Sequence, residues 1–401
     1  MWIERNISGV LKRALAQFPA VVLTGARQTG KTSLVKRLFP RADYISFDIP
    51  REAEAAKSNA EDFLAGHSEP MIFDEVQYVP EILRHLKISI DRDRRAGRYV
   101  LTGSQDFPLM QGVTESLAGR CAVLSLPTLS LPEVFPATTM ADMDAFCWRG
   151  GFPDLWQNRE TDRELWLGSY MATYLERDVR NILNVGRLRD FDRFLRAAAL
   201  RAGRLLSFSE LARDVGIAPN TARSWLSILE ASRQVFLLEP YHTSATKRLV
   251  KTPKLYFTDT GLLLYLMGFQ SWSTISTNAA WGLVWENLVI SETLKYFINR
   301  GKRPPTWFWR TAHGEEIDLL IELGPERFLA VECKTAASIR ATDIRNFSSL
   351  KSAYGEQALV KGAVVCRVDS PGVVCDDPAT AVLPLAGKGG FIEWLDANSK
   401  S

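Results

Sequence analysis

Nine consecutive residues near the start of the chain have the types and spacing needed to hold a nucleoside triphosphate. They follow a short apolar segment and are Gly25, Ala26, Arg27, Gln28, Thr29, Gly30, Lys31, Thr32 and Ser33. In this Gly-x4-Gly-Lys-Thr pattern, backbone N–H groups turn around the β-phosphate, the lysine reaches the β and γ oxygens, and the threonine hydroxyl ligates Mg²⁺. The sequence therefore predicts an ATP and Mg²⁺ site, with Lys31 catalytic and Thr32 a metal ligand.

An acidic pair at the end of the apolar segment "PMIF" adds the groups that hydrolysis needs. Asp74 is placed to hold the Mg²⁺ shell, and Glu75 to polarise the attacking water. The next predicted strand, "RYVL", ends in polar residues, of which Ser104 or Thr102 is the candidate sensor of the γ-phosphate. Arg120, in "ESLAGR", is either an arginine finger for the γ-phosphate of a neighbouring subunit or an ordinary surface arginine.

Three carboxylates and a lysine in the last third of the chain have the types and spacing of a metal-dependent nuclease. Asp318 lies on one predicted strand, Glu332 and Lys334 lie on the next, and Glu286 lies on a helix upstream. Asp318 and Glu332 are the predicted Mg²⁺ ligands, and Lys334 would orient a water or stabilise the transition state. Since alternating charges occur on many exposed strands, the pattern also fits a domain that only binds DNA or assembles.

Two details of this second set can be checked in three dimensions. Glu286 lies beside an apolar stripe, where a carboxylate is costly unless a metal or another cation meets it. A symmetric loop at 324–327 would pair Asp318 with Cys333 and turn Asp318 away from Glu332. An active site therefore requires a loop of odd length, or a β-bulge between the two carboxylates.

The middle of the chain predicts a helix-turn-helix followed by a wing. Ser207 and Glu210 stand in capping-box register, Gly216 ends the first helix, and "PNTARSWLSILEAS" supplies the second. Two strand-like segments follow, "QVFLLEPY" and "KLYFTD". The candidate DNA-binding residues are Asn220, Thr221, Arg223 and Ser224 on the second helix and Lys247, Arg248 and Lys251 on the wing. Winged-helix folds also serve as protein-interaction modules or as lids, so that alternative stays open.

Several short motifs occur in an order that resembles a known family. They are the P-loop, "FDE", "LTGSQ", "SLAGR", "LSLPEVF", "GGFP", "YLERDV" and "KLYFTDTGL". Over nearly its whole length the chain resembles the prokaryotic AAA+ ATPases that carry a C-terminal domain of unknown function. The resemblance implies a AAA+ core, a helical and winged-helix middle, and a C-terminal domain of restriction-endonuclease-like, PD-(D/E)XK-type fold.

The predicted fold class is α/β, because strands and helices alternate through the first 130 residues and again near the end. A P-loop AAA+ parallel-sheet domain is expected at 1–145. A helical and winged-helix domain is expected at 146–275, and an α/β restriction-endonuclease-like domain at 276–401.

Composition narrows the function only a little. The net charge is +3, so nucleic-acid binding must be argued from local clusters. Five cysteines without a C-x-x-C pair argue against a zinc site and a disulfide framework. No signal peptide is recognised, and no apolar run approaches the roughly 20 residues of a membrane span. The expected location is cytoplasmic, with no membrane partner.

The leading hypothesis is an ATP-hydrolysing AAA+ homo-oligomer that acts on DNA in repair, recombination or defence, and whose nuclease-like domain binds or cuts DNA with Mg²⁺. The first alternative is an ATP-dependent switch or scaffold that binds a protein partner and has an inactive nuclease fold. The second is a monomeric or dimeric regulator in which Arg120 never meets the nucleotide of a neighbour.

Overall fold

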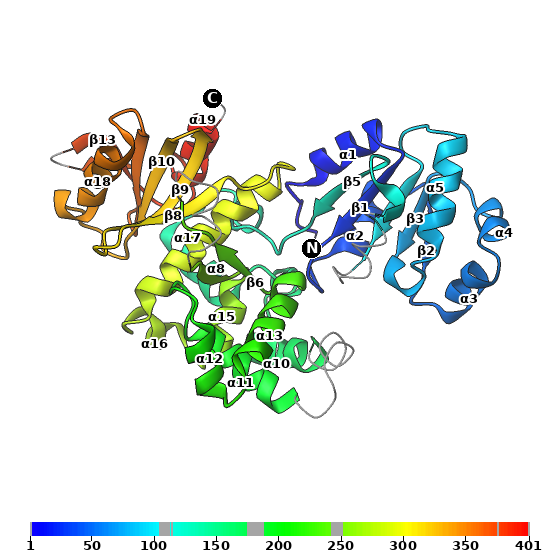
Figure 1. The fold of residues 1–401 in the computed structure, drawn as a ribbon, viewed down its shortest axis with the longest axis horizontal. Coiled ribbons are helices and arrows are strands. Elements are labelled where there is room, and N and C mark those ends of the chain that lie inside the picture. The colour runs from blue at the N-terminus through cyan, green and yellow to red at the C-terminus, as the bar shows by residue number, and fades with distance from the viewer. Residues whose placement is uncertain are drawn as a thin grey trace. The chain divides into compact units, whose positions relative to one another are not determined.

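The computed structural model describes residues 2–103, 113, 115–174, 188–241, 252–374 and 377–399, and the chain divides into two compact units (Figure 1). Unit 1 comprises 1–129, 231–234 and 297–302, and unit 2 comprises the rest. No helix within the described ranges is long and apolar enough to cross a membrane.

The described strands of unit 1 form a parallel sheet with the order β2-β3-β4-β1-β5. They are β1 (Ala20–Thr24), β2 (Asp43–Ser46), β3 (Met71–Asp74), β4 (Tyr99–Thr102) and β5 (Cys121–Ser125). Strand β4 lies between β1 and β3, so the strand that leads into the P-loop and the strand that ends in the acidic pair are one strand apart. Strands β1, β3 and β4 are buried at every position, as expected where helices cover both faces.

Helices pack on both faces of this sheet because side chains alternate along its strands. Ala20 and Val22 of β1 join one apolar cluster with α5, whereas Val21 and Leu23 join another with α1 and α2. The helical elements of unit 1 are α1 (Ser8–Gln17), α2 (Lys31–Leu38), α3 (Pro50–Ser58), α4 (Ala60–Ala65), the 3₁₀ turn η1 (Val76–Tyr78) and α5 (Ile82–Arg92).

The first part of unit 2 is mostly helical and contains the predicted helix-turn-helix. Ser207 caps its first helix by accepting from the Glu210 N–H at 3.3 Å, and Gly216 ends that helix in the left-handed conformation. Trp225 of the second helix packs on Phe191 and Phe194. The elements are α7 (Leu131–Val134), α8 (Met140–Arg149), α9 (Asp154–Gln157), α10 (Arg163–Tyr174), α11 (Leu188–Ala199), α12 (Phe208–Val215), α13 (Pro219–Ala231), β6 (Val235–Leu238), β7 (Lys254–Phe257), α15 (Thr260–Leu266) and α16 (Trp272–Ser276).

The second part of unit 2 is a mixed sheet whose described strands have the order β12-β13-β11-β10-β9-β8. Strands β8, β9 and β10 pair antiparallel, and β10 pairs parallel with β11. Helix α18 packs Phe347 and Leu350 against Phe328 and Ala330 of β10. The elements are α17 (Trp281–Ile298), β8 (Thr306–Arg310), β9 (Glu316–Gly324), β10 (Arg327–Cys333), η4 (Ala341–Ile344), α18 (Arg345–Tyr354), β11 (Leu359–Val365), β12 (Gly372–Val374), β13 (Asp377–Leu383) and α19 (Phe391–Asn398).

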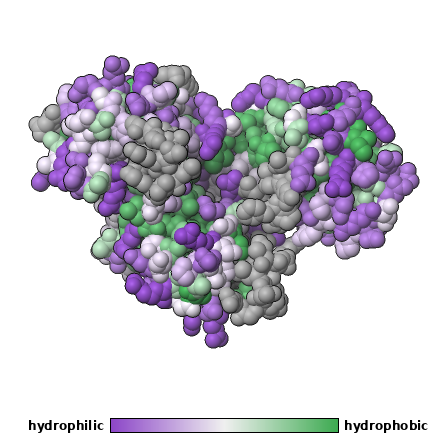
Figure 2. All heavy atoms as spheres, viewed as in Figure 1, coloured by the Kyte–Doolittle hydropathy of each residue, from purple (hydrophilic) through white to green (hydrophobic). Residues whose placement is uncertain are grey.

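These elements confirm the predicted α/β fold class, with a parallel P-loop sheet, a helical middle and a C-terminal mixed sheet. Many of the side chains on the visible face of both units are hydrophilic (Figure 2), whereas the strands that carry the candidate residues are mostly buried.

Candidate functional site

The P-loop joins β1 to α2 and depends on two glycines. Gly30 has a left-handed backbone with φ 88°. A Cβ on Gly25 would lie 2.3 Å from the carbonyl oxygen of Leu126, so only glycine fits there. Lys31 is the first residue of α2, and its Nζ donates to the carbonyls of Gly25 at 3.0 Å and Ala26 at 2.8 Å. The lysine therefore lies folded over the loop that the sequence predicts to hold phosphate.

The other residues of the predicted nucleotide site lie in the same loop and in the first turn of α2. They are Ala26, Arg27, Gln28, Thr29, Thr32 and Ser33, of which Ala26 and Thr29 are buried and Gln28 and Ser33 are exposed. The start of a helix presents N–H groups that have no partner within the helix, which is an arrangement suited to an anion.

Asp74, at the end of β3, accepts hydrogen bonds from three hydroxyl groups. Thr32 Oγ1 donates to Oδ2 at 2.9 Å, Tyr44 OH donates to Oδ2 at 2.6 Å, and Thr102 Oγ1 donates to Oδ1. The strand order explains this convergence, since β2 and β4 flank β3. Burial, together with the hydrogen bond to Asp74, raises the pKa of Tyr44, so the phenol keeps its proton and acts as a donor. Sequence analysis did not single out Tyr44.

The remaining predicted groups of the ATPase site are placed as follows. Glu75 directly follows Asp74 with a left-handed backbone, φ 57°, and its Oε2 accepts from the side chain of Gln77. Ser104 lies outside the described residues, so Thr102 is the sensor candidate that the structure places beside Asp74.

Arg120 forms a two-pronged ion pair within its own chain. Its Nε lies 2.7 Å from Asp91 Oδ1, and its Nη2 lies 2.9 Å from Asp91 Oδ2. The Arg120 side chain as a whole is still 25% exposed. Its role as an arginine finger stays a prediction, and that role requires this pair to open.

Arg5, a buried arginine of the N-terminal segment, donates a hydrogen bond to the P-loop. Sequence analysis missed this residue. Arg5 is 5% exposed, its Nη1 donates to the carbonyl of Thr29 at 2.8 Å, and its Nη2 donates to the carbonyl of Pro127 at 2.7 Å. A guanidinium carries several donors in a fixed fork, so one side chain links the P-loop to the segment after β5. The charges around Arg5 gave no sign of this burial.

The second set of candidate residues meets where β9 and β10 pair. Arg327 lies opposite Gly324, but the next residue lies opposite Glu322, so a β-bulge interrupts the register. Val331 lies opposite Leu319, and the same register continued by one residue places Asp318 opposite Glu332, on one face of the sheet. Of the two arrangements that the sequence analysis allowed for an active site, a loop of odd length or a β-bulge, the structure has the bulge.

Asp318 and Glu332 each accept a hydrogen bond, but the second carboxylate oxygen of Glu332 accepts none. The Cys333 N–H donates to Asp318 Oδ2 at 2.8 Å, and Lys334 Nζ donates to Glu332 Oε2 at 2.7 Å. Glu332 is 2% exposed, and its Oε1 is buried without a hydrogen bond. Burial, reinforced by Asp318, raises the pKa of Glu332 to about 8 despite the opposing effect of Lys334.

An unpaired buried carboxylate oxygen beside a second carboxylate fits a hard cation such as Mg²⁺, which commonly keeps several waters and takes one or two protein carboxylates. Asp318 and Glu332 supply that number. Within the described ranges, no group of three or more histidine, cysteine, aspartate or glutamate side chains is arranged to hold a metal ion. The residues therefore fit a two-carboxylate site.

Glu286 is met by a lysine rather than by the other candidate ligands. Lys254 Nζ lies 2.9 Å from Glu286 Oε1, and Tyr256 OH donates to the same oxygen at 2.5 Å. A carboxylate beside an apolar stripe is costly unless a metal or another cation meets it, and Lys254 is the cation that meets Glu286. Burial first, and Asp318 second, raise the pKa of Glu286 to about 7. Sequence analysis missed both Lys254 and Tyr256.

The predicted DNA-binding residues of α13 lie at its start and face outward. Asn220, Arg223 and Ser224 are exposed and Thr221 is half-buried, while Trp225 is buried. The three predicted wing residues, Lys247, Arg248 and Lys251, lie outside the described residues.

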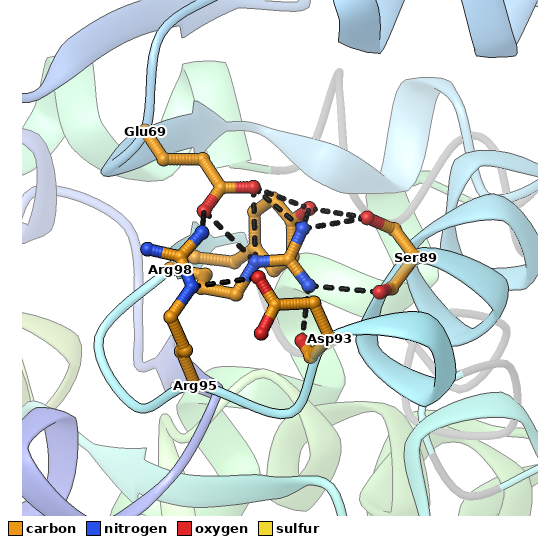
Figure 3. A network of polar contacts seen from close by, with 6 residues as sticks. Glu69, Ser89, Asp93, Arg95 and Arg98 are labelled. Carbon is orange, nitrogen blue, oxygen red and sulfur yellow. Dashed lines mark hydrogen bonds and ion pairs between the residues drawn. The ribbon is translucent and has the colours of Figure 1, made fainter.

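A polar network lies where β3 and β4 begin, at the opposite end of these strands from Asp74 and Thr102 (Figure 3). Arg98 is 6% exposed; its Nη2 donates to Glu69 Oε1 at 2.5 Å and its Nη1 to the carbonyl of Ser89 at 2.8 Å. Tyr99 lies in the same network and borders a cavity of about 350 Å³. The network ties the starts of two strands to α5, away from the strand ends that carry Asp74 and Thr102.

Family models match three consecutive parts of the chain. Residues 17–135 match a model described as AAA domain. Residues 140–273 and 281–385 match models described as domains of unknown function, DUF8612 and DUF4143.

Two mycobacterial proteins are similar to the chain over most of its length. They are Uncharacterized protein Mb2031c of Mycobacterium bovis and Uncharacterized protein Rv2008c of Mycobacterium tuberculosis. Each is 31% identical over 370 residues, which cover 91% of this chain and 80% of the relative.

Solved structures show weaker likenesses. The Walker-type ATPase PABY2304 of Pyrococcus abyssi is 17% identical, with 66% of this chain and 96% of that chain covered and a TM-score of 0.45. AMPPCP-bound DnaA from Aquifex aeolicus is 14% identical, with 56% and 85% covered and a TM-score of 0.30.

Proposed function

Because this chain belongs to the family of the two mycobacterial relatives and has an AAA-type P-loop ATPase domain, we propose that it binds ATP with Mg²⁺ and hydrolyses it. The observation that carries the proposal is the hydrogen bond between Thr32 and Asp74, beside Lys31 at the start of α2. A P-loop hydroxyl and an aspartate at the end of another strand of the same sheet are the pair that holds Mg²⁺ in P-loop NTPases.

Each residue of the site has a separate task in this proposal. The N–H groups of the P-loop and the Lys31 ammonium bind the β- and γ-phosphates, for which Lys31 leaves the carbonyls of Gly25 and Ala26. Thr32 and Asp74 hold Mg²⁺, which when bound neutralises charge on the phosphate oxygens. Glu75 accepts a proton from the attacking water, and Thr102 keeps Asp74 oriented.

The test compares Lys31→Ala and Glu75→Gln with matched controls on exposed residues of the same unit, Lys57→Ala and Glu81→Gln. Lys31→Ala should abolish ATP binding or hydrolysis, and Glu75→Gln should bind ATP normally while hydrolysis stops. Binding is measured with a fluorescent ATP analogue and hydrolysis by phosphate release. Unchanged turnover in either site variant would refute the assignment.

We further propose that the protein acts on DNA through the helix-turn-helix, in repair, recombination or defence. The support is the start of α13, where Asn220, Arg223 and Ser224 are exposed while Trp225 anchors the helix from its other side. Arg223→Ala should weaken binding of duplex DNA in fluorescence anisotropy at low salt, whereas Arg41→Ala, an exposed arginine of unit 1, should not. Equal affinity of the two variants would count against this surface.

For the C-terminal domain, we propose that Asp318 and Glu332 hold Mg²⁺ and that Lys334 orients a water for phosphodiester cleavage. Duplex, single-stranded and branched DNA are incubated with Mg²⁺, with and without ATP. Lys334→Ala should remove cleavage and leave the ATPase rate unchanged. Cleavage retained in that variant would exclude these residues as the site.

A second candidate function is an ATP-dependent switch or scaffold with an inactive nuclease fold. It is favoured by one observation: Glu286 and Glu332 already have lysine partners, Lys254 and Lys334. On this alternative no DNA is cut under any of the conditions above, while the ATPase remains active. Mass measurement with and without an ATP analogue separates the homo-oligomer, in which Arg120 reaches a neighbour, from a monomeric or dimeric regulator.

A further inference from the structure

Lys254 is a buried lysine of the helical part of unit 2 whose charged end lies among carboxylates of the C-terminal sheet domain. It is the first residue of β7 and is 3% exposed. Its Nζ lies 2.9 Å from Glu286 Oε1, on α17, and 2.5 Å from Glu316 Oε1, on β9. A lysine is rarely buried to this degree unless it is paired, and here two carboxylates pair with it.

The position of this lysine is fixed by the strand that carries it. Tyr256 lies two residues further along β7, on the same face, and donates to the same oxygen of Glu286. The side chain of Asn287 accepts from the Phe257 N–H at 2.8 Å and donates to the Phe257 carbonyl at 2.9 Å. These contacts hold β7 against α17, so Lys254 meets Glu286 in a defined geometry.

The charges around the lysine favour a cation at this place. Burial alone would lower the pKa of Lys254, but Glu286, Asp318 and Glu316 together hold it above its usual value. Glu316 also pairs with Arg310, at 2.9 Å, and Glu332 pairs with Lys334. Glu286 has no such alternative cation among its described contacts, so Lys254 is the group that neutralises it.

We propose that Lys254 is the resident cation of this acidic site: its ammonium takes the place on Glu286 that a divalent ion would otherwise take. Glu286 is then a partner of Lys254 rather than a metal ligand, and only Asp318 and Glu332 are left to a divalent ion. A residue of one domain thereby limits how many divalent ions the neighbouring domain holds. The inference rests on the proposed function in one respect only: it takes Asp318 and Glu332 as the ligands of a divalent ion.

The test measures Mn²⁺ binding to the full chain by isothermal titration calorimetry, without nucleotide, in the wild type and in Lys254→Met. Because both proteins keep the same P-loop, any Mn²⁺ bound there cancels in the comparison. Lys254→Met should bind one further Mn²⁺ per chain, or bind Mn²⁺ roughly tenfold more tightly. The double variant Lys254→Met with Glu286→Gln should lose that gain, because Glu286 is the ligand that the lysine occupies.

Lys295 provides a matched control on the same helix as Glu286. It is 4% exposed and lies 2.9 Å from Glu292, so Lys295→Met also breaks a buried lysine–glutamate pair. This variant should gain no Mn²⁺. Equal Mn²⁺ binding by wild type and Lys254→Met, or an equal gain in Lys295→Met, would overturn the proposal.

Thermal unfolding with EDTA and with Mn²⁺ covers the case in which Lys254→Met is unstable. Recovery of its folding by Mn²⁺ supports the proposal. If Lys254→Met folds neither with EDTA nor with Mn²⁺, the variant Glu286→Gln provides the test instead. Glu286→Gln should bind as much Mn²⁺ as the wild type. A loss of Mn²⁺ binding in Glu286→Gln would refute the inference. Failure of the proposed nuclease-like site looks different: Asp318→Asn then leaves Mn²⁺ binding unchanged, while the gain in Lys254→Met persists.

Discussion

Thr32 Oγ1 lies 2.9 Å from Asp74 Oδ2, so the hydroxyl that follows the P-loop lysine contacts the carboxylate at the end of β3. These residues are 42 positions apart in the sequence; Thr32 lies in the first turn of α2, and Asp74 is the last residue of β3. They also have the chemistry to share the ligand shell of one Mg²⁺ ion. The geometry of the ATPase site can therefore be tested through the groups that hold this pair.

Tyr44 is the first such group, because its hydroxyl donates to Asp74 at 2.6 Å. Tyr44→Phe removes that donor but keeps the ring, so the carboxylate loses one of the groups that orient it. The Mg²⁺ concentration for half-maximal ATPase rate should rise roughly tenfold. Tyr265→Phe, in unit 2, is the control and should leave the Mg²⁺ dependence unchanged.

Arg5 supports the P-loop itself, because it donates hydrogen bonds to the carbonyls of Thr29 and Pro127. Arg5→Met leaves these acceptors without their guanidinium donor, at a cost of about 1–3 kcal/mol each. ATP affinity should fall roughly tenfold, and the midpoint of thermal unfolding should drop. Arg13→Met, on the exposed side of α1, should change neither; a normal ATP affinity in Arg5→Met would show that the brace is dispensable.

A substitution at Gly25 tests whether the P-loop must lie close to the segment that follows β5. Its φ is 150°, and an added Cβ would lie 2.3 Å from a backbone oxygen that cannot move aside easily. Gly25→Ala should destabilise the fold and abolish ATP binding. Gly282→Ala, in α17 with no atom within 4 Å of the added Cβ, should instead stabilise the helix by about 1 kcal/mol.

The network around Glu69 predicts a pH dependence of stability. The hydrogen bond from Arg98 lowers the pKa of Glu69 below its ordinary 4.5, an effect that outweighs partial burial. The folded state therefore binds this proton less readily than the unfolded state, and the stabilisation is present above pH 4.5 and lost as the pH falls through the lowered pKa.

Glu69→Gln should thus be less stable than the wild type near neutral pH, and the two should converge in acid. The measurement is the midpoint of urea unfolding across this pH range, with Glu54→Gln, an exposed residue of α3, as control. A gap between wild type and Glu69→Gln that stays constant down to low pH would contradict the assignment.

Local patterns in the sequence were enough to predict the P-loop, the acidic pair at Asp74 and the helix-turn-helix. Each depends on residues that are close together in the chain, where glycine conformation, helix capping and strand burial determine the local structure. The condition on the β9–β10 register was also predictable, because side chains alternate along a strand. The sequence did not show whether β9 and β10 pair with a bulge that brings Asp318 and Glu332 to one face, because the bulge is a property of the strand pairing.

Tertiary structure alone decided which charged and polar side chains meet these residues. Arg5 bonds a carbonyl 122 positions away, Tyr44 reaches Asp74 from a neighbouring strand, and Lys254 of β7 meets Glu286 of α17. A lysine or arginine in a sequence is expected at the surface, and nothing in its neighbours indicates burial. The cost of burying such a charge is offset only by a partner that the fold supplies, so the pairing becomes visible only when the chain is folded.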